Sequence, residues 1–278
     1  MSKQRAPDGD LATYDRETFT HDGVERPVYR KGRGPAVLVL AEMPGISPQV
    51  LGFADRLVAR GFTAALPQLF GTPGFDHTRA SAPALLRTAV RVLSQVCISR
   101  EFTMLATGRS APVVDWRRAL TVHEHARCGG PGVGAVGMCF TGGFALAMAT
   151  EPRVLVPVLS QPSLPLGLTA RHRRSIDCGP RELDVVADRC AREGLRVLGL
   201  RFDGDPFVPA ARFAFLRERL GDGFIAVELD QRDGHPDELL KQHHSVLTAG
   251  LVDAPGEPTH EALQRVLELL ERKLLAPA

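Results

Sequence analysis

Hydrophobic residues along this chain alternate between short continuous runs and runs with helical spacing. Residues 36–41 read Ala-Val-Leu-Val-Leu-Ala, a pattern typical of a strand that is buried on both faces of a sheet. In residues 48–60 the apolar positions recur every three or four residues, which predicts a helix that ends at Gly61. This change of period recurs along the chain and predicts strands connected by helices.

The remaining elements follow the same rule. Thr18–Arg30 alternates around Asp22-Gly23 and predicts an opening hairpin. We expect an α/β fold of the α/β-hydrolase type, with a doubly wound, mostly parallel sheet and helices on both faces. The further strands are expected at 62–66, 133–136, 154–159, 195–201 and 224–229, and the further helices at 81–97, 111–127, 142–150, 180–193, 209–220 and 259–275. Residues 98–110 receive no assignment.

No feature of the sequence divides the chain into two parts. It contains neither a Ser/Gly linker nor a repeat of about 20–50 residues. Residues 1–12 are polar and predict a flexible N-terminus. We therefore expect one domain over residues 13–278.

Composition excludes several classes of protein. The chain is 44% hydrophobic and 24% charged, as in ordinary globular domains, and its net charge of +2 gives no reason to expect nucleic acid or a membrane as partner. The first ten residues lack the apolar segment of a secretory signal, and residues 36–41 are far too few to cross a bilayer. The five cysteines form no CxxC pair, which favours reduced thiols in the cytoplasm over a zinc site or disulfides.

The most informative stretch is the glycine-rich segment 132–145. Gly132, Gly134 and Gly137 match the G-x-G-x-x-G pattern of dinucleotide-binding dehydrogenases. In that pattern, however, the glycines follow a strand, and an acidic residue closes the next strand about 20 residues later. Here the glycines lie before and within the strand, and no such acidic residue follows.

The alternative interpretation is a nucleophile elbow. In such an elbow a strand runs into a sharp turn that presents a nucleophile, and small residues then open a helix. Cys139 would occupy the turn, where a helix N-terminus favours the thiolate and the Phe140 N–H faces a developing oxyanion. A Gly-x-Cys pattern by itself more often marks a buried structural thiol, so the interpretation depends on suitable partners.

A cysteine nucleophile needs a base, and the base needs an acid that orients it. In α/β-hydrolases the acid and then the histidine follow the nucleophile along the chain. Asp203 and Asp205 both lie in the turn after strand 195–201. His235, His243 and His244 all follow the last strand, and their order along the chain does not separate them.

Taken together, these residues resemble the dienelactone hydrolase family of α/β-hydrolases. The similarity spans about residues 36–275, and it selects Asp205 as the acid and His244 as the histidine. The matching segments are Leu40-Ala41-Glu42-Met43-Pro44-Gly45-Ile46, Gly137-Met138-Cys139-Phe140-Thr141-Gly142-Gly143, Asp205-Pro206-Phe207-Val208-Pro209 and His244-Ser245.

The resemblance implies a role for each matched side chain. Cys139 would be the nucleophile, His244 the base and later the acid, and Asp205 the group that orients His244. Glu42 would contact the resting thiol and help to control its ionisation.

The resemblance also implies a reaction. The N–H groups of Met43 and Phe140 would form an oxyanion hole, and the thiolate would attack a small-molecule ester or lactone to give an acyl-enzyme that water hydrolyses. No metal and no organic cofactor would take part. The sequence leaves the oligomeric state open.

Two positions depart from the family pattern. Thr141 stands where a second elbow glycine is usual. Thr248 stands where family members that cleave dienelactone carry an arginine for the substrate carboxylate, and Arg87, Arg117 or Arg201 could replace it. Ester hydrolysis stays the leading hypothesis, and these departures are the reason to keep an alternative beside it, a protein that binds a small ligand or a partner without turnover.

Two long segments also exceed a minimal core of this family. They span residues 67–130 and 230–258. We expect them to form a lid or to shape the pocket.

Overall fold

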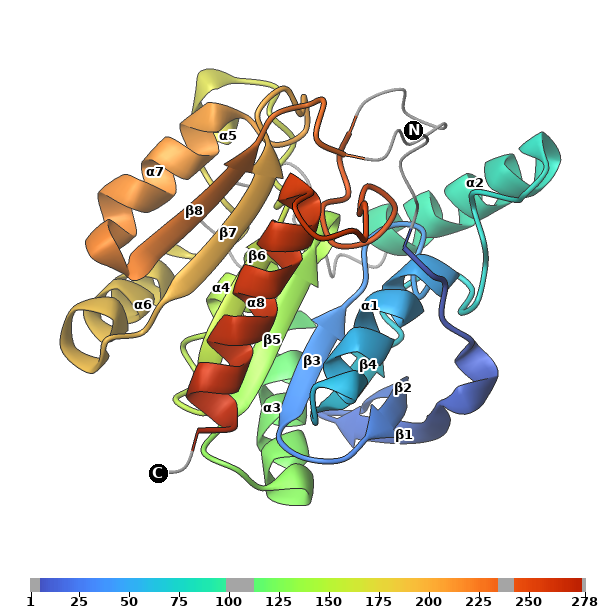
Figure 1. Cartoon of the computed structure of the whole chain (residues 1–278), viewed down its shortest axis with the longest axis horizontal. Helices are drawn as coiled ribbons and strands as arrows, with labels where there is room; N and C mark the ends of the chain where they lie inside the picture. The colour runs from blue at the N-terminus through green and yellow to red at the C-terminus, as the bar shows by residue number, and fades with distance from the viewer. Residues whose placement is uncertain (1–5, 99–112, 235–242, 277–278) are drawn as a thin grey trace.

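The computed structural model describes residues 6–98, 113–234 and 243–276. Within them an eight-stranded sheet forms the centre of the molecule, with helices on both of its faces (Figure 1). From one edge to the other the strands are β1 (Asp15–His21), β2 (Val24–Gly32), β4 (Thr63–Pro67), β3 (Ala36–Leu40), β5 (Val133–Met138), β6 (Val154–Ser160), β7 (Val197–Phe202) and β8 (Phe224–Leu229).

The sheet is parallel from β4 to β8 and antiparallel at one edge. Strands β1 and β2 form the predicted hairpin, whose turn residues Asp22 and Gly23 both have positive φ, at 48° and 75°. Strand β2 then pairs with β4 in antiparallel fashion. The predicted fold class, an α/β-hydrolase fold with a mostly parallel sheet, is confirmed.

The helices form one layer on each face of the sheet. Helices α1 (Pro48–Ala59) and α8 (Pro258–Leu274) pack on one face, in a hydrophobic cluster that includes Val37 and Val39 of β3. The opposite cluster contains Leu38 and Leu40 of the same strand. It is covered by α3 (Val113–Cys128), α4 (Gly142–Met148), α6 (Pro180–Glu193) and α7 (Ala210–Leu220).

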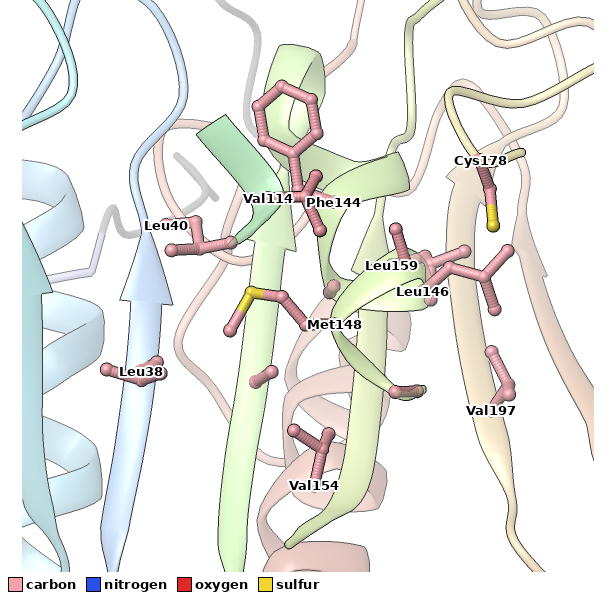
Figure 2. Packing of buried hydrophobic residues seen from close by; sticks show 14 of the residues in the cluster. Leu38, Leu40, Val114, Phe144, Leu146, Met148, Val154, Leu159, Cys178 and Val197 are labelled. Carbon is pink, nitrogen blue, oxygen red and sulfur yellow. The ribbon is translucent and has the colours of Figure 1, made fainter. Parts of the chain in front are cut away.

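Strand β3 shows why its sequence is a continuous apolar run. All five residues of β3 are fully buried, because alternate side chains enter the two clusters. Figure 2 shows Leu38 and Leu40 on the side of the sheet where Phe144 and Met148 of α4 pack.

The predicted elements lie within a few residues of those observed. Two helices remain to be named. Helix α2 (Ala82–Ile98) corresponds to the helix predicted at 81–97, and the single-turn helix α5 (Ala170–Arg173) lies between the strand predicted at 154–159 and the helix predicted at 180–193. Residues 99–110, in the stretch left unassigned, lie outside the described residues. The single domain over residues 13–278 stays a prediction.

The predicted flexible terminus is described from residue 6 onward. There the Gly9 N–H donates to the Pro48 carbonyl at 2.8 Å, at the start of α1. Among the helices of the described part of the chain, none combines the length and the apolar character that crossing a bilayer requires.

The parallel strands bring several chemically interesting segments to one edge of the sheet. Parallel neighbours end at the same edge, so the loops that follow β3, β5, β6 and β7 gather there. Glu42 follows β3, Cys139 follows β5 and Asp205 follows β7, each within three residues of the strand end.

Candidate active site

Cys139 lies in a strained turn between β5 and α4. Its backbone φ is +54°, a region that residues other than glycine rarely occupy. Holding such a residue costs on the order of 1–3 kcal/mol, so the surrounding structure must impose the conformation. Residues Cys139–Thr141 form one turn of 3₁₀ helix that leads directly into α4.

Two glycines make this tight turn sterically possible. A Cβ atom at Gly137 would lie 2.2 Å from the Thr141 carbonyl oxygen, and one at Gly142 would lie 2.6 Å from the Cα of Pro162. Neither approach leaves room for a side chain. The turn therefore needs glycine at 137 and 142, whereas Thr141 has an ordinary helical φ of −95°.

Thr141 braces the elbow from inside the protein. Its hydroxyl oxygen accepts the Met138 N–H at 2.8 Å and lies 2.7 Å from the Leu40 carbonyl oxygen, to which it donates. The hydroxyl thereby ties the end of β5 to the end of β3. The departure from the glycine pattern thus adds a buried polar link and does not block the turn.

His244 and Asp205 form a buried pair beside the elbow. The Nδ1 atom of His244 lies 2.6 Å from Oδ2 of Asp205. The other carboxylate oxygen accepts the Phe207 N–H at 2.9 Å, which fixes the orientation of the acid. The Phe207 ring packs edge-on against the imidazole, with ring centroids 5.5 Å apart.

Ser163 lies close to both the sulfur and the imidazole. Its hydroxyl is 3.5 Å from Cys139 Sγ and 3.5 Å from Nε2 of His244. Its N–H donates to the Cys139 carbonyl at 3.0 Å. Sequence analysis missed this residue, because the loop after β6 carries no recognisable pattern. Its position just past a parallel strand end was the one available signal.

The charge balance at this site favours the protonated imidazole. Burial by itself would lower the pKa of His244, but the negative charge of the Cys139 sulfur and the hydrogen bond to Asp205 outweigh it. The net effect holds the pKa of His244 well above its usual value of 6.5.

Glu42 is buried at the same edge, held by three uncharged side chains. Its carboxylate accepts from Gln161 Nε2 at 2.8 Å, from Ser245 Oγ at 2.7 Å and from Thr248 Oγ1. The expected contact with the Cys139 thiol is absent from the hydrogen bonds of the described residues. Sequence analysis missed Gln161 and the bond to Thr248.

A cavity of about 560 Å³ opens onto these groups. Met43 and Phe140 line it, as the predicted oxyanion hole requires, and the Phe140 N–H belongs to a first helical turn, where amides lack helical acceptors. Helix α2 contributes one wall, which lies within a segment that we expected to shape the pocket. The lining residues include Cys139, His244, Glu42 and Ser245, with Pro44, Phe75, His77, Ala82, Leu85, Leu86, Thr88, Val92 and Phe207.

The competing acid and histidine candidates lie elsewhere. Asp203 is exposed, and its carboxylate accepts the Gln231 N–H at 3.1 Å. The ring of His243 packs against Phe202, at a centroid distance of 5.4 Å. His235 lies outside the described residues.

The three arginines proposed to replace the one missing at position 248 do not line this cavity. Arg201 pairs with Glu228 and donates to the Val208 carbonyl. The Arg117 guanidinium is buried 3.9 Å from the centre of the Phe144 ring. Arg87 lines a neighbouring cavity.

The geometry also argues against a dinucleotide site at the glycine-rich segment. Gly134 lies inside β5, where a Cβ atom would lie 2.5 Å from a methyl group of Leu270 on α8, so close packing of a helix explains this glycine. In the part of the chain that the structure describes, no three His, Cys, Asp or Glu side chains are grouped to hold a metal ion.

The order of the strands and the elbow at the end of β5 define an α/β-hydrolase. The chain is similar to the dienelactone hydrolase family over residues 24–161. That match includes Glu42 and the elbow and ends before Asp205 and His244. The match supports carboxylic ester hydrolase activity. No curated protein matches the sequence.

Solved structures with this fold share little sequence with the chain. A candidate dienelactone hydrolase from Klebsiella pneumoniae has a TM-score of 0.61 and 17% identity, covering 93% of this chain and 98% of that one. A cold-adapted esterase from an Arctic intertidal metagenomic library has a TM-score of 0.55 and 17% identity, covering 99% and 100%. A dienelactone hydrolase-like promiscuous phosphotriesterase from metagenomic libraries has a TM-score of 0.56 and 17% identity, covering 94% and 98%. At these identities the likeness shows the fold.

Proposed function

We propose that this protein hydrolyses a small carboxylic ester or lactone through an acyl-enzyme formed on Cys139. His244 would act as the base and Asp205 as the group that orients it. One observation carries the proposal. A sulfur in a strained elbow and an imidazole both line one cavity, and the imidazole lies 2.6 Å from a buried carboxylate.

The proposed first half-reaction forms a thioester. The Cys139 thiolate attacks the carbonyl carbon, and the carbonyl oxygen becomes an oxyanion that accepts from the N–H groups of Met43 and Phe140. The oxyanion then collapses, and the carbon–oxygen bond to the leaving alcohol breaks. His244 gives its proton to that oxygen, which leaves the imidazole neutral.

The proposed second half-reaction releases the acid. Neutral His244 takes a proton from a water molecule, whose oxygen attacks the thioester carbonyl. Collapse of this second oxyanion breaks the carbon–sulfur bond and restores the thiolate and the imidazolium. Asp205 stabilises the positive imidazole at both stages without taking its proton.

In this proposal Glu42 contributes a fixed negative charge beside the reacting groups. It also positions Ser245, the residue that directly follows His244. The rigidity of the carboxylate is supported by its three hydrogen-bond donors.

A panel of short-chain aryl esters and lactones tests the proposal. Cys139→Ala removes the proposed nucleophile and is expected to lower kcat/KM at least about a thousandfold. The loss is large because removing one residue of a catalytic triad can cost about as much rate as removing all three. Cys128→Ala is the matched control, since Cys128 lies at the end of α3 and outside the cavity lining. Equal rates for wild type and Cys139→Ala would remove the sulfur from the chemistry.

The proposed location is the cytoplasm, where thiols stay reduced. Cys128, Cys139, Cys178 and Cys190 are all free. The non-catalytic alternative predicts that no ester is hydrolysed and that all thiols of the folded protein resist alkylation.

A further inference from the structure

The cavity above Cys139 is lined by the buried Glu42 side chain, and no arginine or lysine among the described residues lines it as well. We propose that the site selects esters whose acyl group carries no negative charge, and that Glu42 is the residue that rejects anionic acyl groups. The inference rests on the proposed ester hydrolysis and names its substrate class.

The charge of Glu42 is met by neutral groups. The side chain is 4% exposed, and its partners are one amide and two hydroxyl groups. No arginine or lysine among the described residues lines the cavity. A carboxylate that entered beside Glu42 would therefore meet a like charge at close range, in a site that water screens poorly.

Most of the rest of the cavity wall is apolar. Leu85, Leu86 and Val92 line it from α2, and Phe75 and Phe207 line it from the facing loops. Apolar walls favour an alkyl or aryl acyl group, because they gain by burying hydrocarbon, whereas a carboxylate loses its water shell there without a partner. The volume of about 560 Å³ fits a small ligand.

His77 also lines the cavity, and its Nδ1 atom is buried without a hydrogen-bond partner among the described residues. An imidazole ring nitrogen can form a hydrogen bond with an uncharged ester, hydroxyl or ether group. This side chain therefore offers a polar contact to an uncharged substrate.

A matched pair of aryl esters tests the inference. The neutral ester is p-nitrophenyl pentanoate, and the anionic ester is mono-p-nitrophenyl glutarate, which has the same chain length and ends in a carboxylate. At pH 8 we expect wild-type protein to show a kcat/KM at least about tenfold higher for the neutral ester, the size expected for one unscreened like charge. Glu42→Gln is expected to reduce this preference at least about threefold.

A second pair of variants covers the case in which Glu42→Gln does not fold. Leu86 lines the cavity and is 67% exposed, so Leu86→Lys and its uncharged control Leu86→Gln are both expected to fold. Leu86→Lys is expected to raise the relative rate with the anionic ester, and Leu86→Gln to leave the ratio near that of wild type.

The outcomes separate the two proposals. Turnover of both esters with equal or higher kcat/KM for the anionic one would overturn the charge selection and leave ester hydrolysis standing. A preference that Glu42→Gln does not change, in folded protein, would remove Glu42 from the selection. No turnover of any ester in the panel would overturn the proposed function and this inference with it.

Discussion

At the scale of single residues, the site depends on how a few buried side chains constrain one sulfur. Cys139 has a φ of +54°, and its carbonyl is held by the Ser163 N–H. The imidazole of His244 is fixed in turn by Asp205. In the proposed mechanism the reacting groups are therefore positioned before substrate arrives. This lowers the entropic cost of orienting them when substrate binds.

The raised pKa of His244 has a consequence for thiol reactivity. That pKa is held well above 6.5, which favours the protonated imidazole. The proposed mechanism pairs this imidazole with a thiolate at Cys139. We expect the rate of Cys139 alkylation by iodoacetamide to change little between pH 6.5 and 8. In His244→Gln the rate should rise with pH as for an ordinary thiol, whose pKa is about 8.5. Mass spectrometry of the Cys139 peptide measures both rates, and identical rising curves would contradict the ion pair.

Ser163 is expected to act on rate more than on stability. Ser163→Ala removes a hydroxyl that lies 3.5 Å from both the sulfur and the imidazole, so kcat should fall about threefold to tenfold while KM stays nearly constant. The free energy of unfolding should fall by ~1 kcal/mol, the usual effect of one lost hydrogen bond. Ser175→Ala is the control, because that hydroxyl donates to the His172 carbonyl and does not line the cavity. Equal changes in kcat for the two variants would contradict a positioning role.

At the scale of elements, the junction of β5, the 3₁₀ turn and α4 is the part on which the site depends most. In this turn neighbouring backbone segments approach positions 137 and 142 so closely that only glycine fits there. Thr141 then links β5 to β3 through one buried hydroxyl. Position 141, where the family usually has glycine, therefore carries a threonine whose hydrogen bonds stabilise the same junction.

Removal of that hydroxyl tests the compensation. Thr141→Val keeps the shape but leaves the Met138 N–H and the Leu40 carbonyl without this partner, at about 1–3 kcal/mol for each unsatisfied group. We expect the free energy of unfolding in urea to fall by about 2–4 kcal/mol. Thr150→Val is the matched control, because Thr150 donates to the Ala147 carbonyl at a helix end and should lose under ~1 kcal/mol. A loss at position 141 no larger than the control would show that the hydroxyl does not brace the elbow.

At the scale of the whole molecule, the fold follows from the sequence more directly than the site does. Continuous apolar runs predict nearly every strand, because these strands are buried on both faces. Apolar residues at helical spacing predict nearly every helix, because these helices are buried on one face. The convergence of Cys139 and Asp205 follows as well, since the ends of parallel strands share an edge.

The contacts within the site could not be predicted in the same way. Gln161 and Ser163 lie in a loop whose sequence has no period, and their role depends on distances across three strands. The partners of Glu42 come from residues 161, 245 and 248, far apart along the chain, so only the folded structure shows that its charge is met by neutral donors. The family resemblance predicts a contact between Glu42 and the Cys139 thiol. The hydrogen bonds of the described residues instead join Glu42 to Gln161, Ser245 and Thr248.

The acyl-enzyme on Cys139 can be tested most directly by trapping the acyl group. Wild-type protein is mixed with p-nitrophenyl pentanoate, quenched in acid within milliseconds to seconds and digested for mass spectrometry. We expect a pentanoyl mass increase on the peptide that contains Cys139, removable by hydroxylamine and absent from Cys139→Ala. Acylation on a different residue, or full turnover in Cys139→Ala with no modified peptide, would contradict it.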